Sequence, residues 1–183
     1  MTTACRIAAY PGSFNPPTIA HVAIAAAARD RHRLDRVDLV VSRRALGKER
    51  PPGPPLDQRV DVLEALASRL GWLGIVVTDR QLIADLAEGY DVVIMGADKW
   101  VQVQDPTFYG GSAAARDEAV ARLPVVAVVR RPPHAVPDDL LLEVPDHLVE
   151  VSSTLARSGR PDLMVEEAAA LDRATGAWTG RPS

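Results

Sequence analysis

Short runs of apolar residues alternate along this chain with longer stretches of helical composition or periodicity. Most of these runs are continuously apolar, and such strands are typical of a parallel sheet that is covered on both faces. Strand and helix alternation favours an α/β fold with right-handed crossover connections. The pattern therefore predicts one mostly parallel sheet of five or six strands. The expected strands are residues 7–10, 37–41, 75–78, 92–95, 125–129 and 148–151.

The stretches between these runs predict the helices. Residues 19–30 are rich in alanine, and residues 57–70 repeat apolar side chains at i, i+3 and i+4, with Asp57 as the expected N-cap and Gly71 as the stop. Further helices are expected at residues 81–88, 112–122, from 153 onward and at 163–172. Together, the expected strands and helices predict a single Rossmann-like α/β domain, residues 1–174, with helices on both faces of the sheet. Residues 175–183 are expected to form a loosely ordered C-terminal tail.

Composition narrows the class of protein. The 183 residues fit about one domain, and 47% apolar with 25% charged residues is ordinary for a globular chain. The net charge of −3 gives no basic footprint for nucleic acid or an anionic membrane. No apolar run is long enough to span a membrane, and the single cysteine, Cys5, cannot form an internal disulfide. A soluble, cytoplasmic protein is expected, with homo-oligomerisation left open.

Open parallel sheets bind ligands at the carboxyl ends of their strands. The loops that follow four of the expected strands, residues 11–21, 42–55, 96–111 and 152–157, are predicted to meet at that edge. In the first loop, Gly12 permits close approach of the backbone to a ligand. Thr18 can cap the next helix, whose N-terminus favours phosphate, and His21 lies on its first turn. These features indicate a phosphate-binding loop. The alternative interpretation is a Gly/Pro turn without a ligand, followed by a histidine on a helix surface.

The loop sequence Gly12-Ser13-Phe14-Asn15-Pro16-Pro17-Thr18-Ile19-Ala20-His21 resembles the GxFxPxHxGH signature of the nucleotidyltransferase superfamily, with Thr in place of the first His. Residues 151–157 are similar to its ISSTxxR motif, and Gly96-Ala97-Asp98 is similar to its GxD motif. No GxxxxGK[ST] or GxGxxG motif is present. The resemblance spans about residues 7–157 and is strongest to the nicotinate/nicotinamide mononucleotide adenylyltransferases.

This resemblance implies adenylyl transfer from ATP to nicotinate or nicotinamide mononucleotide, with release of pyrophosphate, in NAD biosynthesis. The implied catalytic residues are His21, Thr18 and Arg157. Magnesium would be carried by the ATP phosphates, without a metal site made by the protein. The implied nucleotide contacts are Gly12, Ser13, Phe14, Asn15, Gly96, Asp98, Ser152, Ser153 and Thr154.

Two parts of the site have weaker support. Lys48 lies in a basic loop that could close over phosphates, although a solvated run of charges is as good an explanation. Trp100, Phe108 and Tyr109 are the expected acceptor-binding residues, because aromatic rings stack on a pyridine ring; core packing explains Phe108 equally well.

The chain also departs from the pattern. Ala20 replaces a glycine of the signature, and the block after Asp98 lacks a Thr-Trp pair. Two alternatives therefore stay open: the enzyme uses another phosphorylated acceptor, or the chain is a catalytically quiet paralogue that binds nucleotide. The presence of both His21 and Arg157 favours catalysis.

Overall fold

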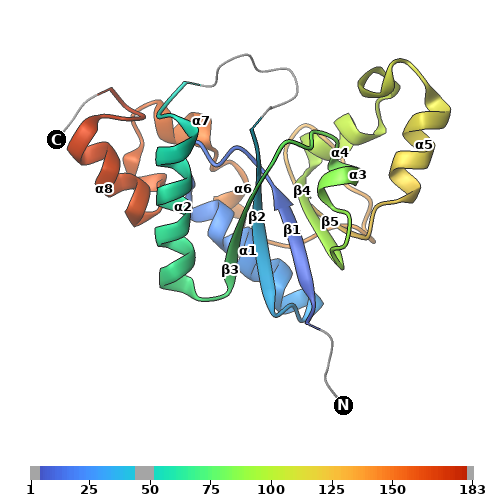
Figure 1. The fold of residues 1–183 in the computed structure, drawn as a ribbon, viewed down its shortest axis with the longest axis horizontal. Coiled ribbons are helices and arrows are strands. Elements are labelled where there is room, and N and C mark those ends of the chain that lie inside the picture. Colours follow the sequence, from blue (N-terminus) through green and yellow to red (C-terminus); the bar gives the residue numbers. More distant parts are fainter. Residues whose placement is uncertain (1–4, 44–51, 181–183) are drawn as a thin grey trace.

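The computed structural model describes residues 5–43 and 52–180, and a five-stranded parallel sheet forms their centre. The strand order is β3-β2-β1-β4-β5, and every neighbouring pair is parallel. Strand β1 lies between β2 and β4, so the winding direction of the sheet reverses beside it (Figure 1). The strands are β1 Ile7–Pro11, β2 Arg36–Ser42, β3 Leu73–Thr78, β4 Val92–Gly96 and β5 Val125–Val129.

Helices cover both faces of this sheet, as the continuous apolar strands predict. Successive strand residues point into different cores: Ala8 packs with α1, α2 and α8, whereas Ala9 packs with α3 and α4. The α-helices are α1 Ile19–His32, α2 Leu56–Leu70, α3 Ile83–Leu86, α4 Ala97–Gln104, α5 Ala113–Ala121, α6 Asp146–Val149, α7 Ser153–Arg157 and α8 Glu166–Thr175. Two 3-10 turns, η1 Pro106–Tyr109 and η2 Pro161–Leu163, complete the elements. None of the described helices combines the length and the hydropathy that crossing a membrane requires.

The fold class is confirmed, but the expected sixth strand at residues 148–151 is wrong. A helical turn, α6, includes the first half of that segment, Leu148 and Val149. The edge of β5 is already used, because Val128 exchanges backbone hydrogen bonds with Leu140 and Leu142. Helix α4 and η1 lie where only a loop was expected, in residues 96–111.

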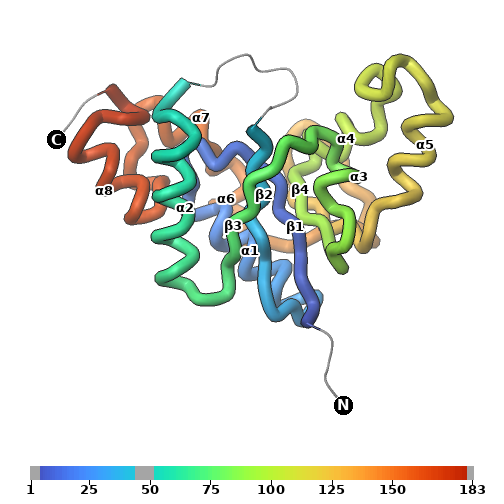
Figure 2. The backbone as a smooth tube through the Cα atoms, in the orientation of Figure 1, coloured from blue at the N-terminus to red at the C-terminus, as the bar shows by residue number. Residues whose placement is uncertain are grey.

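The C-terminal segment returns to the sheet rather than trailing away. Helix α8 lies beside α2 (Figure 2), and Arg69 of α2 forms an ion pair with Glu167 of α8 at 2.5 Å. After α8, Trp178 is only 6% exposed and packs in the main core. The expectation of a loosely held tail does not fit residues 175–180.

Candidate active site

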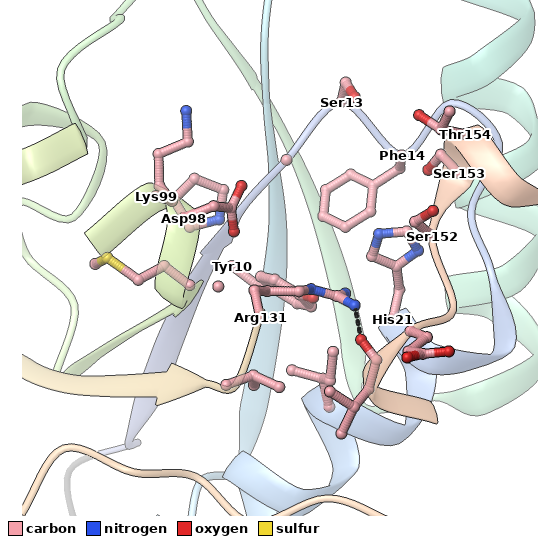
Figure 3. A pocket seen from close by; sticks show the side chains of 18 of the residues that line it. Tyr10, Ser13, Phe14, His21, Asp98, Lys99, Arg131, Ser152, Ser153 and Thr154 are labelled. Carbon is pink, nitrogen blue, oxygen red and sulfur yellow. Dashed lines mark hydrogen bonds between the residues drawn. The ribbon is translucent and has the colours of Figure 1, made fainter. Parts of the chain in front are cut away.

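A cavity of about 540 Å³ lies at the carboxyl ends of β1, β4 and β5. It sits beside the point where the strand order reverses, which is the usual ligand crevice of an open parallel sheet. The loop after β1 forms one boundary, the start of α4 a second, and the start of α7 a third (Figure 3). Three of the four segments that were predicted to converge are therefore neighbours around one cavity. Most of the fourth, residues 42–55, lies outside the described residues.

Phe14 fixes the shape of the loop after β1. Its side chain is 1% exposed, and its backbone has a φ of 42°, which is unusual for a residue with a side chain. The ring packs edge-on against Tyr10 and His21, with centroids 5.5 and 5.1 Å away. A Cβ on Gly12 would lie 2.8 Å from Phe14 Cζ, so only glycine leaves room for this ring.

The imidazole of His21 is held in one orientation by Thr18. The backbone N–H of Thr18 donates to His21 Nδ1 at 2.9 Å, and Thr18 Oγ1 lies 2.8 Å from the same nitrogen. Because a backbone N–H can only donate, Nδ1 is the acceptor, and the neutral ring carries its proton on Nε2. Burial, followed by the positive charge of Arg131, lowers the pKa of His21 to about 3. The neutral ring therefore lines the cavity with an N–H donor.

Polar side chains hold the backbone of the same loop through its carbonyl groups. Arg59 Nη1 donates to the carbonyl of Ser13 at 2.8 Å, and Ser153 Oγ donates to the carbonyl of Pro16 at 2.8 Å. Arg157 Nη1 donates to the carbonyl of Asn15. Arg59 is 8% exposed, and burial lowers its pKa. Helices α2 and α7 thus fix the loop from two sides.

The opposite wall is built around the end of β4. A Cβ on Gly96 would lie 2.5 Å from Asp98 Oδ1 and 3.2 Å from Arg131 Cγ, so this glycine permits their close approach. Arg131, which follows β5, borders the cavity beside Tyr10 (Figure 3). Its Nη1 donates to the carbonyls of Val149 and Val151, the second at 3.2 Å. Arg131 therefore ties β5 to the segment that leads into α7.

Ten of the predicted site residues line this cavity, and they come from all three motifs. They are Gly12, Ser13, Phe14, His21, Gly96, Asp98, Ser152, Ser153, Thr154 and Arg157.

Two other residues of the first motif lie behind the cavity. Thr18 is fully buried and is not part of the lining, so its hydroxyl orients His21 instead of facing a phosphate. Asn15 is 2% exposed, and both ends of its amide are already hydrogen-bonded within the protein. A direct ligand contact does not fit either side chain. Ala20 is fully buried in the core, so its extra methyl group does not face a ligand.

The expected acceptor residues also lie away from the lining. Trp100 packs against the core on the α4 side of the sheet. Tyr109 donates its hydroxyl hydrogen to the carbonyl of Val103 at 3.1 Å, and Phe108 is 37% exposed on η1. None of the three borders the described cavity, so direct ring stacking in this arrangement is not supported. Lys48 lies outside the described residues.

Sequence reasoning missed several lining residues, above all Arg131, Tyr10 and Glu150. Arg131 and Tyr10 belong to the ends of β5 and β1, so the carboxyl-end rule could have found both. Burial raises the pKa of Tyr10, and its phenol therefore stays protonated. Lys99, which follows Asp98 in the sequence, also borders the cavity.

The lining fits a nucleoside triphosphate with its magnesium better than a metal held by the protein. It offers hydroxyl groups, a histidine N–H and cationic side chains to phosphate oxygens. Among residues 5–43 and 52–180, no group of three or more His, Cys, Asp or Glu side chains could hold a metal ion. Magnesium commonly keeps several waters and binds through substrate phosphates, which suits this donor set.

The family model described as cytidylyltransferase-like matches residues 9–159, most of the chain. The chain therefore belongs to the cytidylyltransferase-like family, and the resemblance to nucleotidyltransferases is confirmed. No curated protein matches it.

Among solved structures, the chain is similar to Plasmodium falciparum nicotinic acid mononucleotide adenylyltransferase complexed with NaAD. The two are 14% identical, with a TM-score of 0.56, and the match covers 84% of this chain and 83% of the other. At this identity the likeness establishes the shared Rossmann-like fold.

Proposed function

We propose that this protein transfers the adenylyl group of ATP to nicotinate or nicotinamide mononucleotide and releases pyrophosphate. The observation that carries the proposal is the His21 imidazole, which Thr18 orients so that a neutral ring lines a cavity at the reversal point of the sheet. The family membership and the likeness to a nicotinic acid mononucleotide adenylyltransferase support the same reaction. Such an activity belongs to pyridine nucleotide biosynthesis, and a cytoplasmic location stays a prediction.

The chemistry needs no nucleophile from the protein. A phosphate oxygen of the acceptor attacks the α-phosphorus in line, and the bond from that phosphorus to the bridging oxygen breaks, so pyrophosphate leaves. Catalysis then consists of positioning and of stabilising charge on the phosphoryl oxygens. His21 donates its Nε2–H to an α-phosphate oxygen, where charge shifts during the reaction.

Other residues of the lining hold the rest of ATP in this proposal. Arg157, Ser152 and Thr154 face the β- and γ-phosphates from α7. Asp98 accepts hydrogen bonds from ribose hydroxyls. Bound magnesium would neutralise charge on the triphosphate and leave with pyrophosphate.

A second candidate is nucleotidyl transfer to a different phosphorylated acceptor. The placement of Trp100, Phe108 and Tyr109 away from the cavity favours it, because the three rings expected to stack on a pyridine ring do not line the site. Lys99 and Arg131 also line the cavity and suit an anionic acceptor, and Tyr10 adds a hydroxyl group.

A pyrophosphate-release screen separates these possibilities. Purified protein is incubated with Mg²⁺, ATP or CTP, and one acceptor at a time: nicotinate mononucleotide, nicotinamide mononucleotide or another phosphorylated metabolite. The expected result is release that needs both ATP and a pyridine mononucleotide and that His21→Ala slows about 10²–10³-fold. Release with a different acceptor supports the second candidate. ATP binding without release for any acceptor would identify a quiet paralogue.

A further inference from the structure

Trp178, more than 150 residues beyond the signature loop in sequence, reaches the back of that loop. Its indole Nε1–H donates to Asn15 Oδ1 at 2.6 Å, and the two side chains are 6% and 2% exposed. The carboxylate of Asp172 holds Trp178 in place: it accepts from the Trp178 backbone N–H at 2.7 Å and from the Thr179 hydroxyl at 2.7 Å. Trp178 is therefore held by Asn15 through its side chain and by Asp172 through its backbone.

The indole determines which way the Asn15 amide faces. On the other side of the amide, Asn15 Nδ2 donates to the carbonyl of Pro52 at 2.6 Å. An inverted amide would bring its NH₂ group against the indole N–H, two donors face to face, and its oxygen against the Pro52 carbonyl. The contact is close-packed as well, because a Cβ on Gly53 would lie 2.7 Å from Asn15 Oδ1 and 3.0 Å from Trp178 Cδ1.

Asn15 also connects this contact to the cavity. Its backbone carbonyl accepts from Arg157, and its neighbour Phe14 supports the ring of His21. A rotated or unpaired Asn15 side chain would move the peptide that holds Arg157. The same amide donates to the carbonyl of Pro52, so it also connects the signature loop to the segment that leads into α2.

We propose that Trp178 is a positioning residue for nucleotidyl transfer, acting through Asn15 on the signature loop and Arg157. The kinetic test of this inference, by kcat/KM, rests on the proposed function, whereas the binding test, by the ATP dissociation constant, does not. Removal of the indole donor leaves a buried acceptor unpaired, and the loop loses the contact that selects one amide orientation.

The test variant is Trp178→Phe, which keeps an aromatic ring and removes the N–H. Its matched control is Trp72→Phe: Trp72 precedes β3 at the opposite end of the sheet, where its ring packs against the guanidinium of Arg29. We expect Trp178→Phe to lower kcat/KM about 5- to 150-fold, the effect of one buried unpaired acceptor. Trp72→Phe should stay within about twofold, whatever its effect on the melting temperature.

A double-mutant cycle with Asn15→Ala distinguishes positioning from general loss of structure. If Trp178 acts through Asn15, the double variant loses no more activity than Asn15→Ala alone. Losses that multiply, or a Trp178→Phe protein with activity within twofold of wild type, would overturn the proposal.

Gly53→Ala serves if Trp178→Phe does not fold, because its methyl group would lie 2.7 Å from Asn15 Oδ1 and, at a φ of 116°, also strains the backbone at the same contact. It is expected to lower kcat/KM at least fivefold, and wild-type activity would contradict the proposal.

Calorimetric titration with Mg²⁺ and ATP keeps this inference separate from the proposed reaction. If no acceptor yields pyrophosphate, the proposed transfer fails, and the ATP dissociation constant still decides the role of Trp178. A rise of at least fivefold in Trp178→Phe, absent in Trp72→Phe, supports the positioning role; equal constants overturn it.

Discussion

Replacement of His21 tests the central step, and two variants separate its two roles. The imidazole accepts from the Thr18 N–H through Nδ1 and presents Nε2–H to the cavity. His21→Ala removes both bonds, whereas His21→Asn keeps an oxygen that can accept from Thr18. The asparagine amide is shorter than the ring, so it brings no donor to the position of Nε2. Comparison of the two variants therefore separates the effect of helix capping from the effect of the contact to phosphate.

The two losses differ in size. A preorganised donor to a reacting oxygen contributes about 10²–10³ in kcat. The capping bond contributes about 1 kcal/mol to stability, which corresponds to roughly 2–4 °C in the melting temperature of a chain of this length. We expect kcat to fall about 10²–10³-fold in both variants, and the melting temperature to fall mainly in His21→Ala.

Single-turnover pyrophosphate release, with ATP affinity measured separately, is the suitable assay. Saturating ATP ensures that the observed rate reports the chemical step and not binding. ATP affinity should change much less than kcat in His21→Asn. If that variant keeps more than about a fifth of the wild-type rate, the Nε2–H of His21 does not stabilise the reacting phosphate, and the proposed mechanism is refuted.

Three further predictions follow from the same geometry. The pKa of His21 is about 3 in the folded protein against an ordinary 6.5, so the unfolded chain binds more protons between these pH values. Urea unfolding should therefore show the free energy of unfolding falling as the pH drops from 6.5 toward 3. An equal fall in His21→Ala would contradict this. Arg157→Ala should weaken ATP binding about 10–150-fold in calorimetry, with AMP nearly unaffected, and equal losses for both would place Arg157 away from the outer phosphates. Gly12→Ala should lower kcat at least ~10-fold, because the new methyl group displaces the Phe14 ring that packs on His21; unchanged kinetics would show that this ring does not position the histidine.

The sequence predicts the fold well where a local pattern decides the element. Five of the six expected strands form, because continuous apolar runs require cover on both faces. The run at residues 148–151 has the same composition but becomes a helical turn, since residues 140–142 already occupy the edge of β5. The two segments compete for the same edge of β5, and the composition of each segment alone does not decide which of them pairs with it.

In the site too, local sequence patterns predict some features, and tertiary packing decides the others. The three motifs meet around one cavity, because each follows a strand or begins a helix at the carboxyl edge of the sheet. Burial decides the exceptions: Thr18 and Asn15 carry the right chemistry but face inward, where their groups are used by His21 and Trp178. Arg131 was missed because the loop after β5 was not among the four predicted to meet at the site; the carbonyls that hold its guanidinium lie 18 and 20 residues further along the chain.

The orientation of His21 also limits the form in which it can act. A proton added to the ring would have to occupy Nδ1, which already faces the backbone N–H of Thr18 at 2.9 Å. The Thr18 hydroxyl can rotate to accept from a protonated Nδ1, but the backbone N–H is fixed by the first turn of α1 and would then oppose it. Burial and Arg131 disfavour the cation in the same direction. His21 is therefore built to donate from Nε2 as a neutral ring, and in the proposed reaction the positive charge that the phosphates require would come from arginines and from magnesium on the nucleotide.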